Sequence, residues 1–368
     1  MDATQAPKPP GRIRTAPEDF VVEELSAYAP TGAGQHVFVR FTKTNLTTLA
    51  AVQSLARSLA CDPRAAGFAG MKDKVAVTTQ TVSLEAPTGV DAADLAKRAL
   101  SLSLEGIAVH EAIPHGHKLK PGHLQGNRFA IAVRGVPRDR LRDVTSGLDG
   151  VARRGLPNAF GTQRFGARGD NAERALAWLR DPTAPAPRDK RLARLLWSSL
   201  QSKVYNEVLD ARVRDGTWNV PIEGDLLKLR SSGGLFECAD VATDRERAER
   251  GEVSPTGPMI GARMRWPGGA AQEMERDTVQ RVLGAGFDLE RTRPFGEGSR
   301  RALRLWVQDL RFEIDEADAE NAVACVRVYF VLPKGAYATT VLASIWALDA
   351  PRGPGGPRGN DDEEEEPE

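Results

Sequence analysis

The chain has 368 residues, of which 50 are Lys or Arg and 50 are Asp or Glu, so its formal net charge is zero. This length favours two domains, and a hydrophobic share of 41% with 27% charged residues is typical of a folded globular protein, which excludes wholesale disorder. No apolar run approaches the roughly 18 residues that a membrane helix needs, and the N-terminal residues lack the apolar core of a secretion signal. We therefore expect a cytoplasmic protein with no membrane partner.

The first predicted elements are a strand and a helix. In residues 36–41, Val37, Val39 and Phe41 fall on one face, as in a half-buried strand. Residues 44–60 predict a helix that follows Thr and Asn capping candidates. The apolar face of this helix consists of Leu49, Val52, Leu55 and Leu59.

The same alternation continues to about residue 135. Residues 91–100 repeat the helical pattern, and residues 127–135 predict a second strand. One face of that strand carries Phe129, Ile131 and Val133, and the other carries Arg128 and Arg134. This part of the chain therefore has an α+β pattern.

The middle of the chain is predicted to be more helical. Asn171 is a candidate cap for a helix over 172–180, and a longer helix is predicted over 191–214, with Gly216 as its stop. The apolar stripe of the longer helix consists of Leu192, Leu195, Leu196, Leu200, Val204 and Val208. Short β elements are expected in residues 224–230 and 254–264.

Strand patterns return in residues 302–314 and 324–333, followed by a turn and a last helix. One domain interrupted by a second would explain this order. The chain ends in an acidic segment that holds seven Asp or Glu residues between Asp361 and Glu368, which leaves 43 acidic against 50 basic residues in positions 1–360, or about +7. The surplus permits a polyanionic partner. We expect the segment 350–368 to be a disordered tail that is solubilising, and weak competition with such a partner for the basic surface is the less favoured alternative.

The segment GMKDKVAVTTQ, residues 70–80, carries the strongest chemical signal. Asp73 stands between Lys72 and Lys74 in a short loop that leads into a β-branched strand. Flanking cations would keep the carboxylate ionised, as a nucleophile at neutral pH requires. The charge pattern alone favours a solvated turn over a nucleophile.

The whole string resembles the signature G-x-K-D-K/R-x-A-x-T-x-Q of the TruD family of pseudouridine synthases, whose catalytic aspartate falls on Asp73. Further segments resemble the family in the same order, so the likeness covers most of residues 12–345. They are EDFVVEEL (18–25), GQHVFVRFTKTNLTT (34–48), GHLQGNRFAIAVRG (122–135), GLPNAFGTQRFG (155–166), LQSKVYN (200–206), GDLL (224–227), PTGPMIG (255–261) and FVLPKGAYATTVL (330–342).

This resemblance implies an α+β fold in which a catalytic domain with a central mixed or mainly antiparallel sheet is interrupted by an α+β TRUD domain. The expected catalytic domain comprises residues 1–154 and 301–349, and the inserted domain comprises residues 155–300. The implied activity is the isomerisation of uridine to pseudouridine in tRNA, at position 13, by a monomer. The target uridine must leave its stack to reach Asp73.

The resemblance also implies a set of substrate-binding residues around Asp73. Phe129 corresponds to the aromatic residue that stacks on the flipped base, although a core position on its strand is the simpler alternative. The remaining candidates are Asn127, which would bind the base or its own loop, Lys72, Glu24, Phe20 and Arg164. Arg164, in a glycine-rich loop, would contact phosphate or Asp73, and a structural role is nearly as well supported. Tyr337 is expected either near the site or as an anchor of the last helix.

The reaction needs no redox cofactor, metal or nucleoside triphosphate, and the sequence has no phosphate loop or dinucleotide fingerprint. The histidines at 110, 115, 117 and 123 lack the Cys or carboxylate partners of a metal site, and Cys61, Cys238 and Cys325 are too far apart for one. Two rival functions remain. A non-catalytic RNA-binding protein would use the same scaffold, whereas a glycoside hydrolase would need a second carboxylate and an aromatic-rich cleft.

Overall fold

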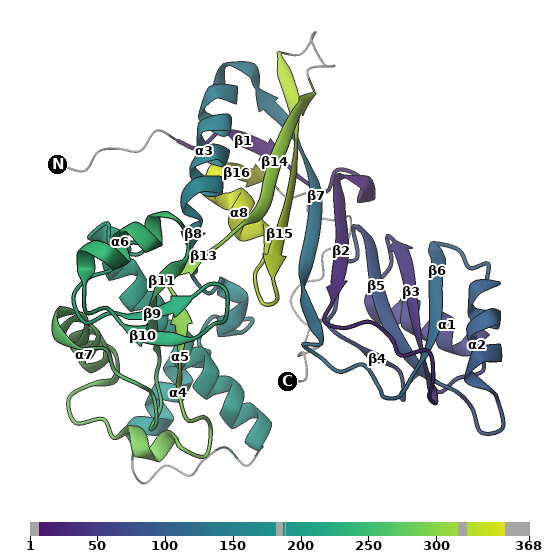
Figure 1. Ribbon diagram of the computed structural model, residues 1–368, viewed down its shortest axis with the longest axis horizontal. Coiled ribbons are helices and arrows are strands. Elements are labelled where there is room, and N and C mark those ends of the chain that lie inside the picture. The colour runs from purple at the N-terminus through teal and green to yellow at the C-terminus, as the bar shows by residue number, and fades with distance from the viewer. Residues whose placement is uncertain (1–6, 182–186, 188, 316–321, 350–368) are drawn as a thin grey trace. The chain divides into compact units, whose positions relative to one another are not determined.

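The computed structural model describes residues 7–181, 187, 189–315 and 322–349, which belong to two compact units (Figure 1). The first unit is formed by Met1–Ala152 together with Val307–Glu368, and the second by Arg153–Trp306. The acidic tail expected to be disordered, residues 350–368, lies outside the described residues. Among the described residues, no helix is both long and apolar enough to cross a membrane.

The first unit is built on a sheet of ten described strands with the central order β14-β15-β7-β2-β5-β3-β6. Neighbours are antiparallel except for β2 with β5 and β1 with β16, which are parallel. The strands are β1 (Pro10–Arg12), β2 (Phe20–Ser26), β3 (His36–Thr44), β4 (Gly67–Phe68), β5 (Val77–Glu85), β6 (Ile107–His115), β7 (Leu124–Pro137), β14 (Gln308–Asp315), β15 (Val323–Pro333) and β16 (Ala347–Asp349). This mixed sheet with helices packed on it confirms the predicted α+β fold.

Helices of the first unit cover this sheet. They are α1 (Thr48–Ser58), α2 (Ala92–Leu100), α3 (Leu141–Arg154), which ends two residues inside the second unit, and α8 (Ala338–Ile345), with the 3-10 turns η1 (Pro17–Asp19) and η2 (Arg138–Arg140). Thr47 caps α1, and its hydroxyl accepts a hydrogen bond from the amide of Ala50 at 3.1 Å. Buried side chains of α1, α2, β3 and β5 form one core in which Val37, Val39 and Phe41 are fully buried, as the alternation predicted.

β7 also has the two faces that its sequence predicted. Phe129, Ile131 and Val133 are buried, whereas Arg128 and Arg134 lie on the opposite face. Arg128 pairs with Glu23 at 2.6 Å, and Arg134 binds the buried carboxylate of Asp19. The strand at the centre of the sheet is therefore held by an apolar face and an ion-paired face.

The second unit surrounds one long helix. Its elements are β8 (Leu156–Pro157), η3 (Thr162–Phe165), α4 (Asn171–Arg180), α5 (Lys190–Arg214), β9 (Leu226–Leu229), β10 (Leu235–Glu237), α6 (Val241–Glu249), β11 (Val253–Met259), α7 (Gly269–Leu283), η4 (Leu289–Thr292), β12 (Ser299–Ala302) and β13 (Arg304–Leu305). The described strands form a four-stranded sheet, β10-β9-β11-β12, and a pair, β13-β8. α5 buries Leu196, Leu200, Val204 and Val208 of the predicted stripe and is followed by Gly216 with a φ of 69°.

One prediction about this unit is wrong. Asn171 does not cap α4 but is its first residue, and the residue at the cap, Asp170, makes no side-chain cap hydrogen bond. Strand structure returns in residues 302–314 as predicted, and it is divided among the end of β12, β13 and β14. β12 and β13 belong to the second unit, and β14 belongs to the first.

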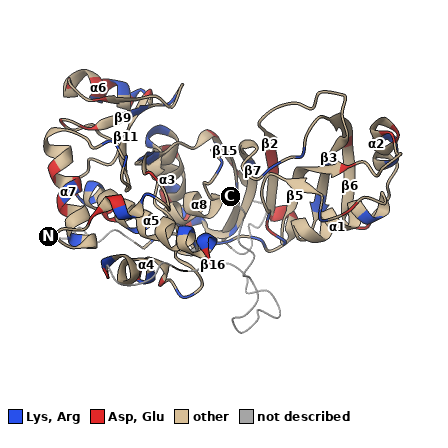
Figure 2. Ribbon diagram, turned by 90° about the horizontal axis from the view of Figure 1, so that it is seen from below, with Lys and Arg blue, Asp and Glu red and all other residues tan. Residues whose placement is uncertain are grey.

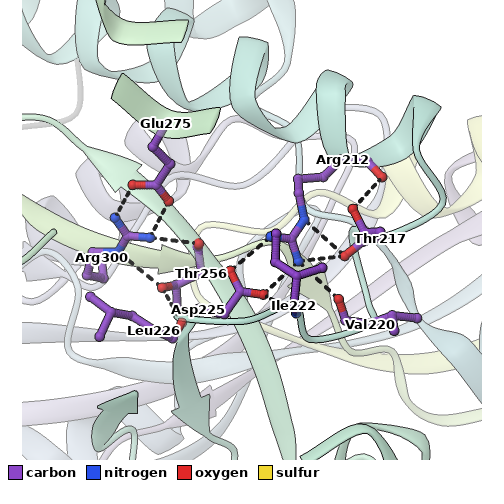
Figure 3. A network of polar contacts seen from close by, with 9 residues as sticks. All are labelled: Arg212, Thr217, Val220, Ile222, Asp225, Leu226, Thr256, Glu275 and Arg300. Atoms are coloured by element: carbon purple, nitrogen blue, oxygen red, sulfur yellow. Dashed lines mark hydrogen bonds and ion pairs between the residues drawn. The ribbon is translucent and has the colours of Figure 1, made fainter. Parts of the chain in front are cut away.

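A buried network of two ion pairs connects the elements of the second unit (Figure 3). Arg212 of α5 makes two hydrogen bonds to Asp225, at 2.9 and 2.8 Å. Arg300 of β12 makes two to Glu275 of α7, at 2.7 and 2.6 Å, and its Nε donates to the hydroxyl of Thr256 at 3.1 Å. Each carboxylate thus has a bidentate partner, which offsets the large cost of burying charge.

Candidate active site

The loop that carries Asp73, residues 69–76, joins β4 to β5 in the first unit. Its backbone is held from beneath by side chains of two neighbouring elements. Lys43 of β3 donates to the carbonyl oxygen of Asp73 at 2.7 Å, and the hydroxyl of Thr48 accepts from the amide of Lys72 at 2.9 Å. Thr48 in turn donates to the buried Gln80 at 3.2 Å. These hydrogen bonds to buried polar side chains therefore fix the backbone of the loop.

The carboxylate of Asp73 pairs with Arg14, which lies 59 residues earlier in the chain. The Asp73 side chain remains 57% exposed, so a ligand can reach it. Arg14 has a φ of 59°, and its guanidinium carbon lies 4.2 Å from the centre of the Phe20 ring. Neither Lys72 nor Lys74 forms an ion pair with Asp73 within the described chain. The cation beside the candidate nucleophile is thus Arg14.

Lys43 is a second cation of this site, and it is fully buried. Its ammonium group donates to the carbonyl oxygens of Leu46 and Asp73, both at 2.7 Å. Burial lowers the pKa of Lys43 to about 8, an effect that Asp73 opposes and Lys72 reinforces. A charged lysine in this position is costly, and its two hydrogen bonds hold the start of the β3–α1 connection against the Asp73 loop.

Lys72 and Glu24 form a buried ion pair at 3.0 Å, with side chains 8% and 2% exposed. Glu24 also accepts a hydrogen bond from the amide of Thr81 at 3.3 Å. The pair thus links β2 to the Asp73 loop and to β5. In this structure Lys72 is turned toward Glu24 and away from solvent, which favours a role in organising the loop.

Three phenylalanines lie together on β2, β7 and β15. Phe129 is 6% exposed; its ring centre lies 6.3 Å from that of Phe20 and 5.3 Å from that of Phe330. Asn127 is paired with Glu24 across the sheet, and its side-chain oxygen is buried without a hydrogen-bond partner among the described residues. Gly126 allows the backbones of β7 and β15 to lie close together, because a Cβ at this position would lie 2.2 Å from the carbonyl oxygen of Leu332.

The structure therefore brings together six of the seven residues predicted for the site: Asp73, Lys72, Glu24, Phe20, Phe129 and Asn127. Arg164 belongs to the second unit, where η3 places it beside α5. Its guanidinium donates to the hydroxyls of Ser198 and Ser202 and lies 5.6 Å from the ring centre of Phe160. Arg301 lies closer to the same ring, at 4.1 Å.

The histidines form a cluster of another kind. Around Tyr28, the rings of His115, His117 and His123 all lie within 5.6 Å of its ring centre. His110 is elsewhere and hydrogen-bonds Thr42. No group of three or more His, Cys, Asp or Glu among the described residues is arranged to hold a metal ion.

Sequence reasoning missed Arg14, Phe330 and the position of Lys43 under Asp73. The burial of Lys43 could have been predicted, because Lys43 continues the alternation of Val37, Val39 and Phe41 and so falls on the buried face of β3. Arg14 had no local signal. Tyr337, expected near the site or as an anchor, is 55% exposed at the start of α8, and its side chain makes no cap hydrogen bond.

Comparison with known proteins places this site in a family. The model of the family described as tRNA pseudouridine synthase D (TruD) matches residues 2–181 and 183–345. A protein named tRNA pseudouridine synthase D from Anaeromyxobacter dehalogenans strain 2CP-C is 42% identical over 344 residues, covering 92% of this chain and 94% of its own. One of the same name from Methylococcus capsulatus is 39% identical and covers 92% of each chain.

The fold agrees with these sequence matches. A crystal structure of a tRNA pseudouridine synthase D (TruD) from Methanosarcina mazei superposes with a TM-score of 0.74 at 23% identity, over 93% of this chain and 94% of that one. At this identity the likeness concerns the fold. Because the family model spans nearly the whole chain, including the Asp73 loop, this chain belongs to the TruD family of tRNA pseudouridine synthases.

Proposed function

We propose that this protein is a tRNA pseudouridine synthase that isomerises uridine at position 13 and that Asp73 is its catalytic carboxylate. The observation that carries the proposal is the exposed Asp73 carboxylate, paired with Arg14 and held over buried Lys43, within a chain that matches the family along its length. The proposed catalytic domain comprises residues 1–154 and 301–349, with residues 155–300 as the inserted domain. We further propose a cytoplasmic monomer whose partner is tRNA.

The reaction breaks the bond from ribose C1′ to N1 of uracil, turns the base, and joins C5 to C1′. The proton on C5 leaves to solvent and N1 gains one, so no oxidant or reductant takes part. Asp73 either attacks the sugar or the base, or removes a ribose proton to give a glycal-like intermediate, and both routes need its ionised form. Arg14 lies beside the carboxylate and forms an ion pair with it.

Phe20, which contacts Arg14, and Phe129, which packs on Phe20, support a role in binding the flipped base. We propose that uracil packs against Phe129 and Phe20, and that the side-chain oxygen of Asn127 accepts the N3 proton of the base. The missing partner of that buried oxygen supports this assignment, since buried polar atoms are usually hydrogen-bonded. Lys72 and Glu24 support the loop from below, and Arg164 contacts the RNA backbone from the inserted domain.

The test is to incubate unmodified tRNA with the native protein and with Asp73→Asn, and to measure pseudouridine at position 13. We expect modification by the native protein, none by the variant, and equal tRNA affinity, because the substitution keeps the shape of the side chain and removes its ability to act as a carboxylate.

Binding without modification by either protein would contradict the position-13 assignment. A transcriptome-wide pseudouridine map would then distinguish another target uridine from the non-catalytic RNA-binding alternative. Modification by Asp73→Asn at the native rate would contradict the role of the carboxylate.

A further inference from the structure

The loop of residues 116–123, between β6 and β7, is fixed against the segment that leads to Asp73. The amide of Gly122 donates to the carbonyl oxygen of Ala69 at 2.8 Å. A Cβ at Gly67 would lie 2.2 Å from the carbonyl oxygen of Leu119, so the two segments touch through their backbones. The amide of Leu119 also donates to Ser83 at 2.9 Å. The backbone of the loop of residues 116–123 is therefore attached to the segment that leads into the Asp73 loop.

The loop is rigid as well as anchored. Leu119 is buried in an apolar cluster with Phe38, Ala69 and Leu124. The amide of His123 donates to the carbonyl oxygen of Lys120 at 3.1 Å, which closes a turn with Pro at its second position and Gly122, at a φ of 79°, at its third. This is the residue pattern of a type II turn. Lys118 and Lys120, on either side of Leu119, therefore extend from a backbone that is held in place.

The charge of the loop is unbalanced. Lys and Arg occur together with Asp and Glu along the elements of both units (Figure 2), but residues 112–138 contain no Asp or Glu. Within that stretch Arg128 and Arg134 are paired with acids from other elements. Lys118 and Lys120 are exposed, and neither forms an ion pair within the part of the chain that the structure describes. Burial lowers the pKa of His115, so this histidine adds little charge to theirs.

We infer that the loop of residues 116–123 binds the phosphate backbone of the RNA strand that carries the target uridine, through Lys118 and Lys120. This inference rests on the proposed function, which supplies the RNA. A strand that delivers one nucleotide to Asp73 has phosphates on both sides of it, and the loop fixed to the Asp73 segment is where such a phosphate passes. Lysines bind phosphate as compact point charges, and this contact positions the strand without reading its sequence.

The experiment compares two double variants of the full chain, Lys118→Gln/Lys120→Gln and Arg57→Gln/Arg64→Gln. The second pair is the matched control, because Arg57 and Arg64 are exposed on the same unit and form no ion pair among the described residues. The dissociation constant of unmodified tRNA is measured over a range of salt concentrations for both variants and the native protein. Thermal unfolding establishes that both variants are folded.

We expect the slope of log affinity against log salt to become shallower by about 1 for each lysine in the loop variant, with the control unchanged. Equal slopes for the two variants would overturn the inference. Equal slopes combined with weaker binding of a polyglutamate probe by the loop variant would overturn it in favour of an acidic polypeptide.

These outcomes are separate from those that test the proposed function. Absence of pseudouridine with the native protein would contradict the proposed activity, and the salt slopes would still decide whether the loop binds RNA. Normal activity with equal slopes would contradict the loop assignment alone.

Discussion

Asp73 combines an exposed carboxylate with a backbone that is held by buried groups. The side chain reaches Arg14, whereas the main chain is held by Lys43 and, through the neighbouring amide, by Thr48. A catalytic group needs this division, because its reacting atoms must be open to substrate while its position is fixed to within a fraction of an ångström. Lys43 is costly to bury, and its direct contact with the Asp73 backbone gives that cost a functional explanation.

The pH dependence of stability tests the burial of Lys43. Its pKa is lowered from 10.5 to about 8 in the folded protein, so the folded protein releases this proton before the unfolded chain does. Between these pH values unfolding takes up a proton, and raising the pH therefore increases the free energy of unfolding at this residue. We expect the native protein to gain stability relative to Lys43→Met as pH rises through this window.

Urea unfolding of both proteins across the window gives the measurement. The variant lacks only this titrating group, so the difference between the two curves removes the contribution of all other residues. Parallel curves would show that Lys43 titrates as an ordinary exposed lysine and would contradict its burial under Asp73.

At the scale of elements, periodicity predicted which faces of the strands are buried, but it did not predict features that depend on one specific contact. The inward faces of β3 and β7 follow from alternation because each strand has one buried side. Asn171 failed as a cap because its side chain is buried and its oxygen accepts from Arg174 at 3.2 Å, so it is used inside α4. Strand structure in residues 302–314 was predicted, but alternation does not reveal that its parts pair with different partners, β11, β8 and β15.

The ion pairs that connect α5, α7, β9, β11 and β12 give a prediction about these elements. Arg300→Met leaves the carboxylate of Glu275 buried without its partner, which is expected to cost about 3–5 kcal/mol of unfolding free energy. Arg263→Met breaks a pair with Glu297 in which both side chains are about 60% exposed, and it should cost roughly 0–1 kcal/mol. Urea midpoints of the two variants provide the comparison.

The two arginines lie in the same unit, so a general effect of losing a charge would shift both midpoints equally. Such equal shifts would contradict the assignment of the Arg300–Glu275 pair as an anchor of the fold. A large shift for Arg300→Met that Glu275→Gln partly relieves in the double variant would support it further, because the neutral amide removes the unpaired charge.

At the scale of the whole molecule, the family motifs predicted segments that the fold brings together in the candidate site, whereas the ion pair of Asp73 with Arg14 is found only in the structure. The motif around Asp73 and the segment around Phe129 are far apart in sequence, and the mixed sheet brings both into the first unit. Arg14 could not be found this way, since a single arginine 59 residues from its partner has no periodicity or composition that marks it. Long-range ion pairs depend on the folded backbone, which short patterns do not encode.

Net charge gives the prediction that belongs to the whole chain. The seven acidic residues from Asp361 to Glu368 cancel the surplus of 50 basic over 43 acidic residues in positions 1–360. Replacing these seven by Asn and Gln keeps the length of the chain and raises its net charge to about +7. We expect the neutral-tail variant to bind tRNA several-fold more tightly at about 0.05 M salt, and nearly as the native protein does at about 1 M, where charges are screened within about 3 Å. Equal affinities at low salt would show that the acidic residues do not compete with RNA, and a difference that persists at high salt would show that they act by something other than their charge.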